Sequence, residues 1–175
     1  SHLLWMFEGN RQEVEKTTGE IYDVVLFGHN RIGFDLLKTF KEMKMNFVVV
    51  DYNPSTIIKL ERKKINCVYG DASDREFINE LKLNKAKLVI STILNVESNR
   101  IIKRRLEEIG SEAVFIATAD QIPEAMLLYK EGVDYVLLPH ILGGKYASKL
   151  IEKYKEDKNL YREYAKLQRE ELRKR

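Results

Sequence analysis

The stretch that decides the fold is VVLFGHNRIG, residues 24–33. Its first four residues form a short apolar run, which is typical of a buried strand, and helical spacing follows it. Gly28, Asn30 and Gly33 match the spacing of the dinucleotide-binding fingerprint G-x-G-x-x-G, with asparagine in the middle position. In such a turn the first glycine permits the sharp reversal, and the helix that follows points free N–H groups at a phosphate. The stretch therefore predicts a strand, a phosphate-binding turn and a helix.

Outward from this turn, short apolar runs alternate with segments of helical spacing. The further expected strands cover residues 47–50, 67–69, 88–90, 113–117 and 135–138. Asn53 and Pro54 are expected to open the second helix, and Ser73 to start the third within a capping box. The alternation predicts an α/β fold of the Rossmann-like, doubly wound kind, with a parallel six-stranded sheet in the order 3-2-1-4-5-6. A C-terminal helical extension follows it.

The composition is that of a folded domain, and its charge is unevenly distributed. Hydrophobic residues make up 44% and charged residues 33% of the 175 residues, which excludes disordered and collagen-like classes. Residues 153–175 hold nine Lys or Arg and five Asp or Glu, a net charge of +4, so the first 152 residues carry −1. The basic excess lies on the tail, and we expect no nucleic-acid partner. The single cysteine, Cys67, excludes an internal disulfide and suits a reducing cytosol.

These patterns divide the chain into three expected segments. Residues 1–20 form a linker with an apolar N-terminal stub, residues 21–141 the nucleotide-binding domain, and residues 142–175 the C-terminal helical extension. Apolar residues punctuate the charged extension, so it either packs on its own sheet or leaves the domain to pack on a partner. The longest apolar runs are far shorter than the ~20 residues that a membrane-spanning helix needs.

Three positions near the turn bear on which nucleotide it would bind. Asp51 ends the second strand 23 residues after Gly28, where it would accept hydrogen bonds from ribose hydroxyls and repel a 2′-phosphate. The side chain of Asn30 crowds a pyrophosphate, which mildly favours a single phosphate, as in AMP. Arg31 would either grip a phosphate or lie solvated in the first helical turn. The alternative is a glycine turn in a doubly wound fold that binds no nucleotide.

Two more strand ends would complete the pocket. Asp71 follows the third strand, where it would accept a hydrogen bond from an adenine amino group or serve as an ordinary helix-cap acid. Ser91, Thr92 and Ile93 follow the fourth strand, beside the switch point where ligands bind in such sheets. They would flank the adenosine or form only a strand-end turn.

Five motifs in this order resemble the nucleotide-binding lobe of the regulator-of-potassium-conductance (RCK) family, which is also described by its TrkA N-terminal domain. They span residues 24–144 and read VVLFGHNRIG, VVVDYNP, VYGDAS, LVISTI and EGVDYVLLPHILGG. The Asn-Arg-Ile-Gly variant and the Leu-Pro-His-x-x-Gly-Gly ending are most similar to the cytosolic domains of Kef-type monovalent cation:proton antiporters.

The resemblance implies a non-enzymatic regulatory domain at the cytoplasmic face of the cell membrane. Such a domain binds NAD(H), AMP or a related adenine nucleotide, forms a homodimer, and gates a potassium or sodium/proton transporter. The transporter is attached in the same chain or associated with it, and the N-terminal apolar stub fits a domain cut away from a preceding membrane part. Carried over by motif, the ligand contacts would be Gly28, His29, Asn30, Arg31, Ile32, Gly33, Asp51, Tyr52, Asn53, Asp71, Ala72, Ser91, Thr92 and Ile93.

The main alternative is a fragment of an NAD-dependent oxidoreductase, because this fold hosts many of them. A dehydrogenase needs a substrate site and an acid–base group, whereas the nucleotide domain uses up most of this chain. His29 lies in the phosphate turn and His140 follows a strand end, so neither suits that role. Tyr154 and Lys158 have the Y-x-x-x-K spacing of short-chain reductases but lie on the charged tail. We therefore expect no catalytic residue and no metal site.

Two smaller alternatives concern single features. Cys67 would be a redox sensor only if its thiol were reactive, and in an expected buried strand it is read as an inert hydrophobe. The basic residues of the tail would bind anionic lipid, but the interspersed acids favour an ordinary solvated helix face.

Overall fold

The computed structural model of the chain describes residues 19–174. Most of the expected N-terminal linker and stub, residues 1–18, therefore lies outside the described residues. The chain divides into two compact units between Leu137 and Leu138, and we call them the sheet unit and the helical unit.

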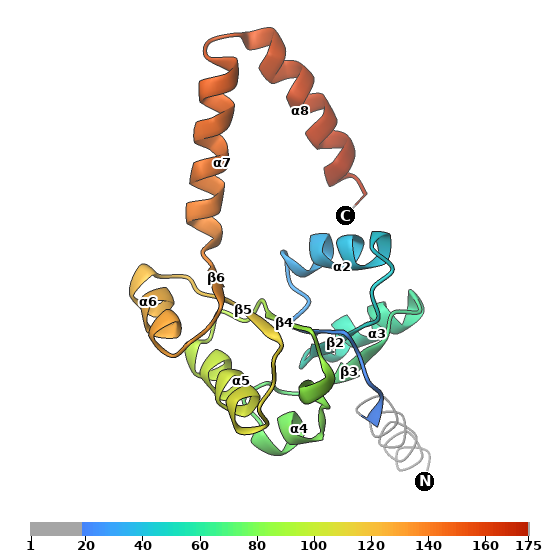
Figure 1. The fold of residues 1–175 in the computed structure, drawn as a ribbon. Coiled ribbons are helices and arrows are strands. Elements are labelled where there is room, and N and C mark those ends of the chain that lie inside the picture. Colours follow the sequence, from blue (N-terminus) through green and yellow to red (C-terminus); the bar gives the residue numbers. More distant parts are fainter. Residues whose placement is uncertain (1–18, 175) are drawn as a thin grey trace. The chain divides into compact units, whose positions relative to one another are not determined.

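The sheet unit is built on one six-stranded parallel sheet in the order β3-β2-β1-β4-β5-β6 (Figure 1). Its strands are β1 (Val24–Phe27), β2 (Phe47–Asp51), β3 (Cys67–Tyr69), β4 (Leu88–Ser91), β5 (Val114–Thr118) and β6 (Tyr135–Leu137). The first strand pairs with β2 on one side and β4 on the other, so Val24 lies opposite both Phe47 and Leu88. The predicted α/β fold and strand order are confirmed. The switch point, beside which ligands bind in such sheets, therefore lies between β1 and β4.

Helices cover both faces of this sheet. They are α2 (Gly33–Glu42), α3 (Pro54–Arg62), α4 (Arg75–Glu80), α5 (Val96–Glu108) and α6 (Ile122–Lys130), and a short 3-10 helix, η1 (Leu83–Lys85), leads into β4. Figure 1 shows α2 and α3 on one face and α4, α5 and α6 on the other. Because all six strands run parallel, their carboxyl ends lie at the same end of the sheet, and the loops that follow the strands gather there.

The first strand is buried on both faces, as a central strand of a parallel sheet must be. Val24 and Leu26 belong to a core that also contains Leu37 and Phe40 from α2. Phe27 is fully buried too, and because side chains alternate along a strand it points to the opposite face. The strand end from which the glycine turn departs is thus held from both sides.

Side-chain caps fix the helix starts next to the strand ends. Asn53 caps α3 as predicted, since its Oδ1 accepts a hydrogen bond at 3.0 Å from the backbone N–H two residues on, and Pro54 opens the helix. The prediction that Ser73 starts the third helix is wrong. Asp74 is the cap, and its Oδ1 accepts from the backbone N–H groups two and three residues on, at 2.9 and 3.3 Å. A carboxylate at that place also suits the positive end of the helix dipole.

The helical unit consists of α7 (Pro139–Tyr154) and α8 (Lys158–Leu172). Near the turn between them, the ring of Tyr154 lies 5.6 Å from that of Tyr161 and 6.0 Å from that of Tyr164, centroid to centroid. No residue of either helix is buried. Across the part of the chain that the structure describes, no helix combines the length and the apolar character that crossing a membrane requires.

Candidate functional site

A cleft of about 410 Å³ opens where β1, β2, β3 and β4 end. Its volume falls in the range of roughly 300–1,000 Å³ that small-molecule sites occupy. It lies beside the switch between β1 and β4, which is where doubly wound sheets bind their ligands. The cleft is lined by Phe27, Gly28, His29, Asn30, Val50, Asp51, Tyr52, Asn53, Thr56, Gly70, Ala72, Thr92, Ile93 and Leu94.

Gly28 can only be glycine in this geometry. Its φ is +83°, in the left-handed region that side chains with a Cβ rarely adopt, and a Cβ built there would lie 2.8 Å from Oγ1 of Thr92. That hydroxyl donates a hydrogen bond to the carbonyl oxygen of Gly28 at 2.8 Å. The turn after β1 is therefore tied directly to the end of β4, across the switch point.

Gly33 has the close-approach role that the fingerprint assigns to its last glycine. The residue is buried, and a Cβ there would lie 3.3 Å from the carbonyl oxygen of Gly28. The helix α2 can therefore start directly against the turn. It begins at Gly33, slightly later than the expected start near Arg31.

Asn30 fills the middle position of the fingerprint and uses both ends of its amide. Its Nδ2 donates to the backbone oxygen of Thr92 at 2.7 Å, and its Oδ1 accepts from the backbone N–H of Ile32 at 3.1 Å. The side chain thus binds one of the free N–H groups at the start of α2, which a glycine would leave available to a phosphate. The cleft accordingly offers fewer backbone donors than the all-glycine turn.

Asp51 joins the end of β2 to the glycine turn. Its side chain is 8% exposed, and its two carboxylate oxygens accept from the backbone N–H groups of His29 at 2.7 Å and of Asn53 at 2.8 Å. A carboxylate has about four lone-pair positions, so these two bonds leave room for ribose hydroxyls. Asp51 therefore has a structural role, and the binding role that the sequence predicts for it stays a prediction.

His29 presents a neutral ring to the cleft near neutral pH. Burial lowers the pKa of its imidazole, and the carboxylate of Asp51 offsets part of that shift. Its backbone N–H, rather than its ring, makes the bond to Asp51. The backbone N–H of His29 is thus taken by Asp51, and a contact of His29 with a ligand stays a prediction.

Asp71 lies at the end of β3 but does not line the cleft. The residue is exposed, and its Oδ1 accepts from both the backbone N–H and the hydroxyl of Ser73, each at 2.8 Å. These contacts form a local turn before α4, so Asp71 is not the helix cap of the alternative interpretation either, and its contact with adenine stays a prediction. Ala72 and Gly70 line the cleft in its place.

Gly70 is a lining residue outside the predicted set, and its neighbour explains it. A Cβ at Gly70 would lie 2.1 Å from the ring of Phe77, so a side chain there would displace that ring. The signal in the sequence is the glycine directly after a short strand, which marks a close approach of some other group.

Ser91 and Thr92 divide the roles predicted for the end of β4. Ser91 is fully buried, and its hydroxyl accepts from the backbone N–H of Ile93 at 3.3 Å, so it shapes the strand-end turn. Thr92 and Ile93 line the cleft, although the hydroxyl of Thr92 is occupied by the glycine turn. This strand end therefore presents an apolar side chain, that of Ile93, and backbone groups to a ligand.

The structure brings nine of the fourteen predicted contacts together around the cleft. The predicted residues outside the lining are Arg31, Ile32, Gly33, Asp71 and Ser91. The lining residues outside the predicted set are Phe27, Val50, Thr56, Gly70 and Leu94. Phe27, Val50, Gly70 and Leu94 each adjoin a run of predicted contact residues, so extending each run by one residue would have included them.

The residues on which the alternative functions depend are not among those that line this cleft. Tyr154 ends α7 and Lys158 begins α8, so the Y-x-x-x-K pair is split between two helices instead of sharing a helical face. Cys67 is half-buried in β3, and burial, followed by the charge of Glu61, raises its pKa to about 11. A thiol with that pKa is protonated at neutral pH and has little nucleophilic character.

Comparison with known proteins identifies the family. The profile of the TrkA-N domain matches residues 24–139, which is more than half of the chain. The chain belongs to the TrkA-N domain family. The matched range begins at β1 and ends at the first residue of α7, so it contains the whole sheet and the cleft.

One curated relative is a channel protein. "Potassium channel protein 1" of Methanocaldococcus jannaschii is 26% identical over 122 residues, and the match covers 69% of this chain and 37% of that protein. The chain therefore spans about a third of that relative's length, and the rest of the relative has no counterpart here.

Several solved structures share the fold of this TrkA-N chain. The TrkA-N domain of the inner membrane protein ybaL from Escherichia coli has a TM-score of 0.69 at 21% identity, with 75% of this chain and 98% of that one covered. The Kef CTD of Shewanella denitrificans in its AMP-bound form has a TM-score of 0.63 at 15% identity, covering 85% and 90%. The GsuK channel bound to NAD has a TM-score of 0.60 at 21% identity, covering 69% and 22%.

Proposed function

We propose that the cleft binds an adenine nucleotide, AMP or NAD(H), and that this TrkA-N domain is the ligand-sensing part of a membrane cation transporter. The observation that carries the proposal is the glycine turn, which Asp51 ties to β2 and Thr92 ties to β4 at the switch point. A rigid turn of this kind sets backbone N–H groups for a phosphate beside a carboxylate suited to ribose hydroxyls. The predicted contacts that line the cleft are the residues we assign to the ligand.

AMP is the better fit of the two nucleotides. Asn30 occupies the N–H of Ile32, so the turn keeps donors for one phosphate more readily than for two. The AMP-bound form of the Kef CTD and the NAD-bound form of the GsuK channel are structures of the same fold, which supports both ligands as candidates. Asp51 disfavours a ribose 2′-phosphate, because two negative charges would meet there.

The partner that we propose is a transporter of monovalent cations. The similarity to a potassium channel protein supports a potassium pathway, and the motif variants support a Kef-type cation:proton antiporter. We place the domain at the cytoplasmic face of the membrane, with the transmembrane part in the same chain or in an associated one. Regulation then requires that the nucleotide binds two arrangements of the domain with different affinities.

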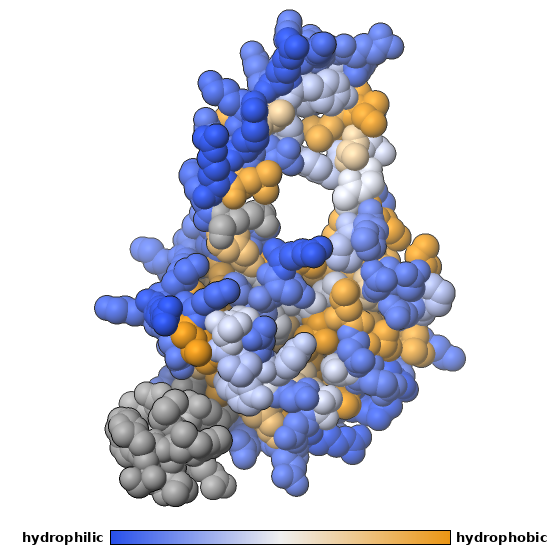
Figure 2. Space-filling model, turned by 180° about the vertical axis from the view of Figure 1, so that it is seen from behind, coloured by the Kyte–Doolittle hydropathy of each residue, from blue (hydrophilic) through white to orange (hydrophobic). Residues whose placement is uncertain are grey.

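A homodimer is part of the proposal, and exposed apolar surface supports it. In the sheet unit α6 exposes Ile122 and Met126, which are 59% and 62% accessible, and Figure 2 shows apolar patches at the surface on the side where α6 lies. In the helical unit Tyr146, Ile151 and Leu167 are each more than half exposed. Surfaces of this kind mark interaction sites when they are contiguous. We assign residues 21–141 to the nucleotide-binding domain and residues 142–175 to an extension that meets the partner.

The proposal is tested by calorimetric titration of the chain with AMP, ATP, NAD and NADH. We expect saturable binding of AMP, weaker binding of NAD(H), and a loss of affinity of about tenfold in Asp51→Asn, the scale of one or two hydrogen bonds to a charged group. Asp23→Asn is the matched control, since Asp23 precedes β1 at the other end of the strand and, among residues 19–174, forms its ion pair with Lys87. No binding by any of the four at millimolar concentration would overturn the proposal.

The oxidoreductase alternative has its own test. A dehydrogenase fragment would turn over NADH in the presence of carbonyl substrates, whereas a sensor binds the nucleotide unchanged. Absorbance at the NADH band reports the difference directly. Robust turnover would replace the regulatory proposal by the enzymatic one.

A further inference from the structure

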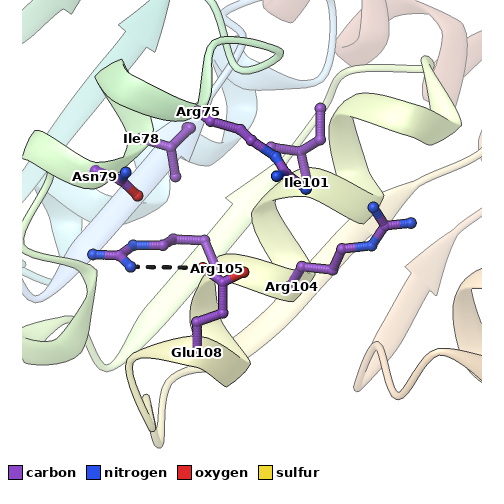
Figure 3. Close-up of a pocket in the computed structure, with 7 residues that line it drawn as sticks. All are labelled: Arg75, Ile78, Asn79, Ile101, Arg104, Arg105 and Glu108. Carbon is purple, nitrogen blue, oxygen red and sulfur yellow. Dashed lines mark ion pairs between the residues drawn. The ribbon is translucent and has the colours of Figure 1, made fainter.

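A second pocket of the sheet unit lies between α4 and α5. Its volume is about 110 Å³, and it shares no lining residue with the nucleotide cleft. Two isoleucines form its apolar part, and its polar lining consists of Arg75, Asn79, Arg104, Arg105 and Glu108 (Figure 3). We call it the arginine pocket.

Two of the arginines reach across the gap between the helices. Figure 3 shows Arg75 extending from α4 toward α5, and Arg105 extending from α5 toward α4 with its guanidinium near Asn79. Arg104 also lines the pocket, but its guanidinium points away from the other two arginines, and the same residue lines another hollow together with Glu131. Donors from two helices therefore converge on one small space.

The charge of this lining is not balanced by its own carboxylate. Glu108 is the acidic member, and its contact with Arg105 is long, 3.7 Å, with the Glu108 side chain 60% exposed. An exposed pair of this kind contributes little. Among residues 19–174, no ion pair within 4.0 Å involves Arg75 or Arg104. The guanidinium groups of Arg75 and Arg105 beside the single carboxylate of Glu108 leave the pocket with a net positive charge.

One guanidinium N–H also finds no acceptor within residues 19–174. It is the Nε of Arg105, which is buried, although the rest of that side chain is partly exposed. Buried donors of charged groups are normally satisfied, so this unsatisfied N–H marks a guanidinium whose charge the described residues compensate only in part. It belongs to the same side chain that reaches into the pocket.

We infer that the arginine pocket binds a phosphate-type oxyanion, as a site separate from the nucleotide cleft. Arginine is the residue best suited to tetrahedral oxyanions, because its planar fork donates two parallel hydrogen bonds. The volume equals that of roughly three to four water molecules at ~30 Å³ each, which suits one such ion and excludes a nucleotide. The ion would accept from the terminal guanidinium N–H groups of Arg105, from Arg75 and from the amide of Asn79.

The test is a titration of the isotope-labelled chain with inorganic phosphate at constant ionic strength, followed by NMR. We expect the arginine Nε–H signal of Arg105 and the backbone amides of α4 and α5 to shift and saturate. A parallel titration with methyl phosphate tells which form of phosphate the pocket accepts. Similar shifts with both ligands indicate a site that also takes a phosphomonoester, whereas shifts with inorganic phosphate alone indicate a site for the free ion. Shifts at the glycine turn alone, or equal shifts with added chloride, would overturn the inference.

Two exposed side chains give variants of opposite sign. Arg75→Gln removes a donor and should weaken phosphate binding by about tenfold, whereas Glu108→Gln removes the competing carboxylate and should strengthen it. Arg62→Gln is the matched control, because Arg62 is an exposed arginine on α3 outside the pocket. A gain of affinity in Glu108→Gln cannot come from unfolding. Unchanged phosphate affinity in both pocket variants would overturn the inference. The affinity of the cleft for nucleotides is tested by the separate calorimetric titration and does not depend on this result.

Discussion

The nucleotide cleft and the arginine pocket lie in one sheet unit, yet they offer an anion opposite chemistries. The cleft contains no lysine or arginine in its lining, and its one acidic side chain, Asp51, is already bonded to backbone N–H groups. The arginine pocket is lined by three arginines, two of which reach into it, and by one glutamate. The first site depends on the exact course of the backbone, and the second depends on charge. Substitutions and salt should therefore affect the two sites differently.

The largest expected effect is that of Gly28→Ala. The new Cβ would meet Oγ1 of Thr92 at 2.8 Å in a backbone with a φ of +83°, so the turn must move. We expect the free energy of unfolding to fall by about 2 kcal/mol, the upper range for left-handed strain in a residue with a Cβ. We also expect AMP binding to be lost and phosphate binding at the arginine pocket to persist. Chemical denaturation and calorimetry measure the two effects.

Gly110→Ala is the control for that experiment. Gly110 also has a positive φ, +59°, but nothing lies within 4 Å of its Cβ position, and it follows α5 far from the glycine turn in the sequence. The variant should lose stability through backbone strain alone and keep its affinity for AMP. Equal loss of AMP affinity in both variants would show that the cleft responds to global stability and not to the turn.

The next largest effect is the different salt dependence of ligand affinity at the two sites. Raising NaCl from about 50 to about 200 mM should weaken phosphate binding at the arginine pocket about threefold or more, because exposed charges are screened. AMP binding in the cleft should fall less steeply, since no cationic side chain lines it. Parallel titrations at several salt concentrations give both slopes. Identical slopes would contradict the contrast between the sites.

A smaller effect is expected from Asn30→Gly, which restores the full glycine fingerprint. The substitution frees the backbone N–H of Ile32, to which the Asn30 side chain is bonded at 3.1 Å. We expect the affinity for NAD relative to AMP to rise about fivefold, the value of one additional hydrogen bond. The variant should also be less stable, because the bond from Asn30 to Thr92 is lost. An unchanged ratio in competition titrations would remove Asn30 from nucleotide selection.

The smallest effect is the pH dependence contributed by His29. Burial lowers the pKa of its ring below the ordinary value of 6.5, so the folded chain binds a proton less readily than the unfolded chain. Stability should therefore decline as the pH falls from about 6.5 toward the folded pKa, and should not depend on this group above that window. In His29→Gln this part of the decline should disappear from denaturation curves. An unaltered pH profile would show that His29 does not titrate with folding.

The sheet and the strand-end positions of the cleft were predictable from the sequence. Periodicity and the glycine spacing suffice for them, because burial on both faces makes central strands such as Val24–Phe27 continuously apolar. The cap of the third helix was mispredicted, since Ser73 and Asp74 both suit that role and the choice depends on Asp71, which takes the Ser73 hydroxyl. Adjacent capping residues cannot be ranked by local pattern alone.

The arginine pocket was not predictable in the same way. Arg75 and Arg105 are 30 positions apart in the sequence, and they line the same pocket only because α4 packs against α5. The dual use of Asp51 was equally hidden, because its bond to His29 spans 22 positions. Interactions between side chains on different helices or strands can be recognised only once the packing of those elements is known.

The most direct test of the central claim is where AMP binds. Titration of the isotope-labelled chain with AMP, followed through backbone amide signals, should perturb Gly28, His29, Thr92 and Ile93, which line the cleft. The amides of the arginine pocket on α4 and α5 should stay unperturbed at concentrations that saturate the cleft. Perturbations confined to the arginine pocket, or none at saturating AMP, would contradict the account.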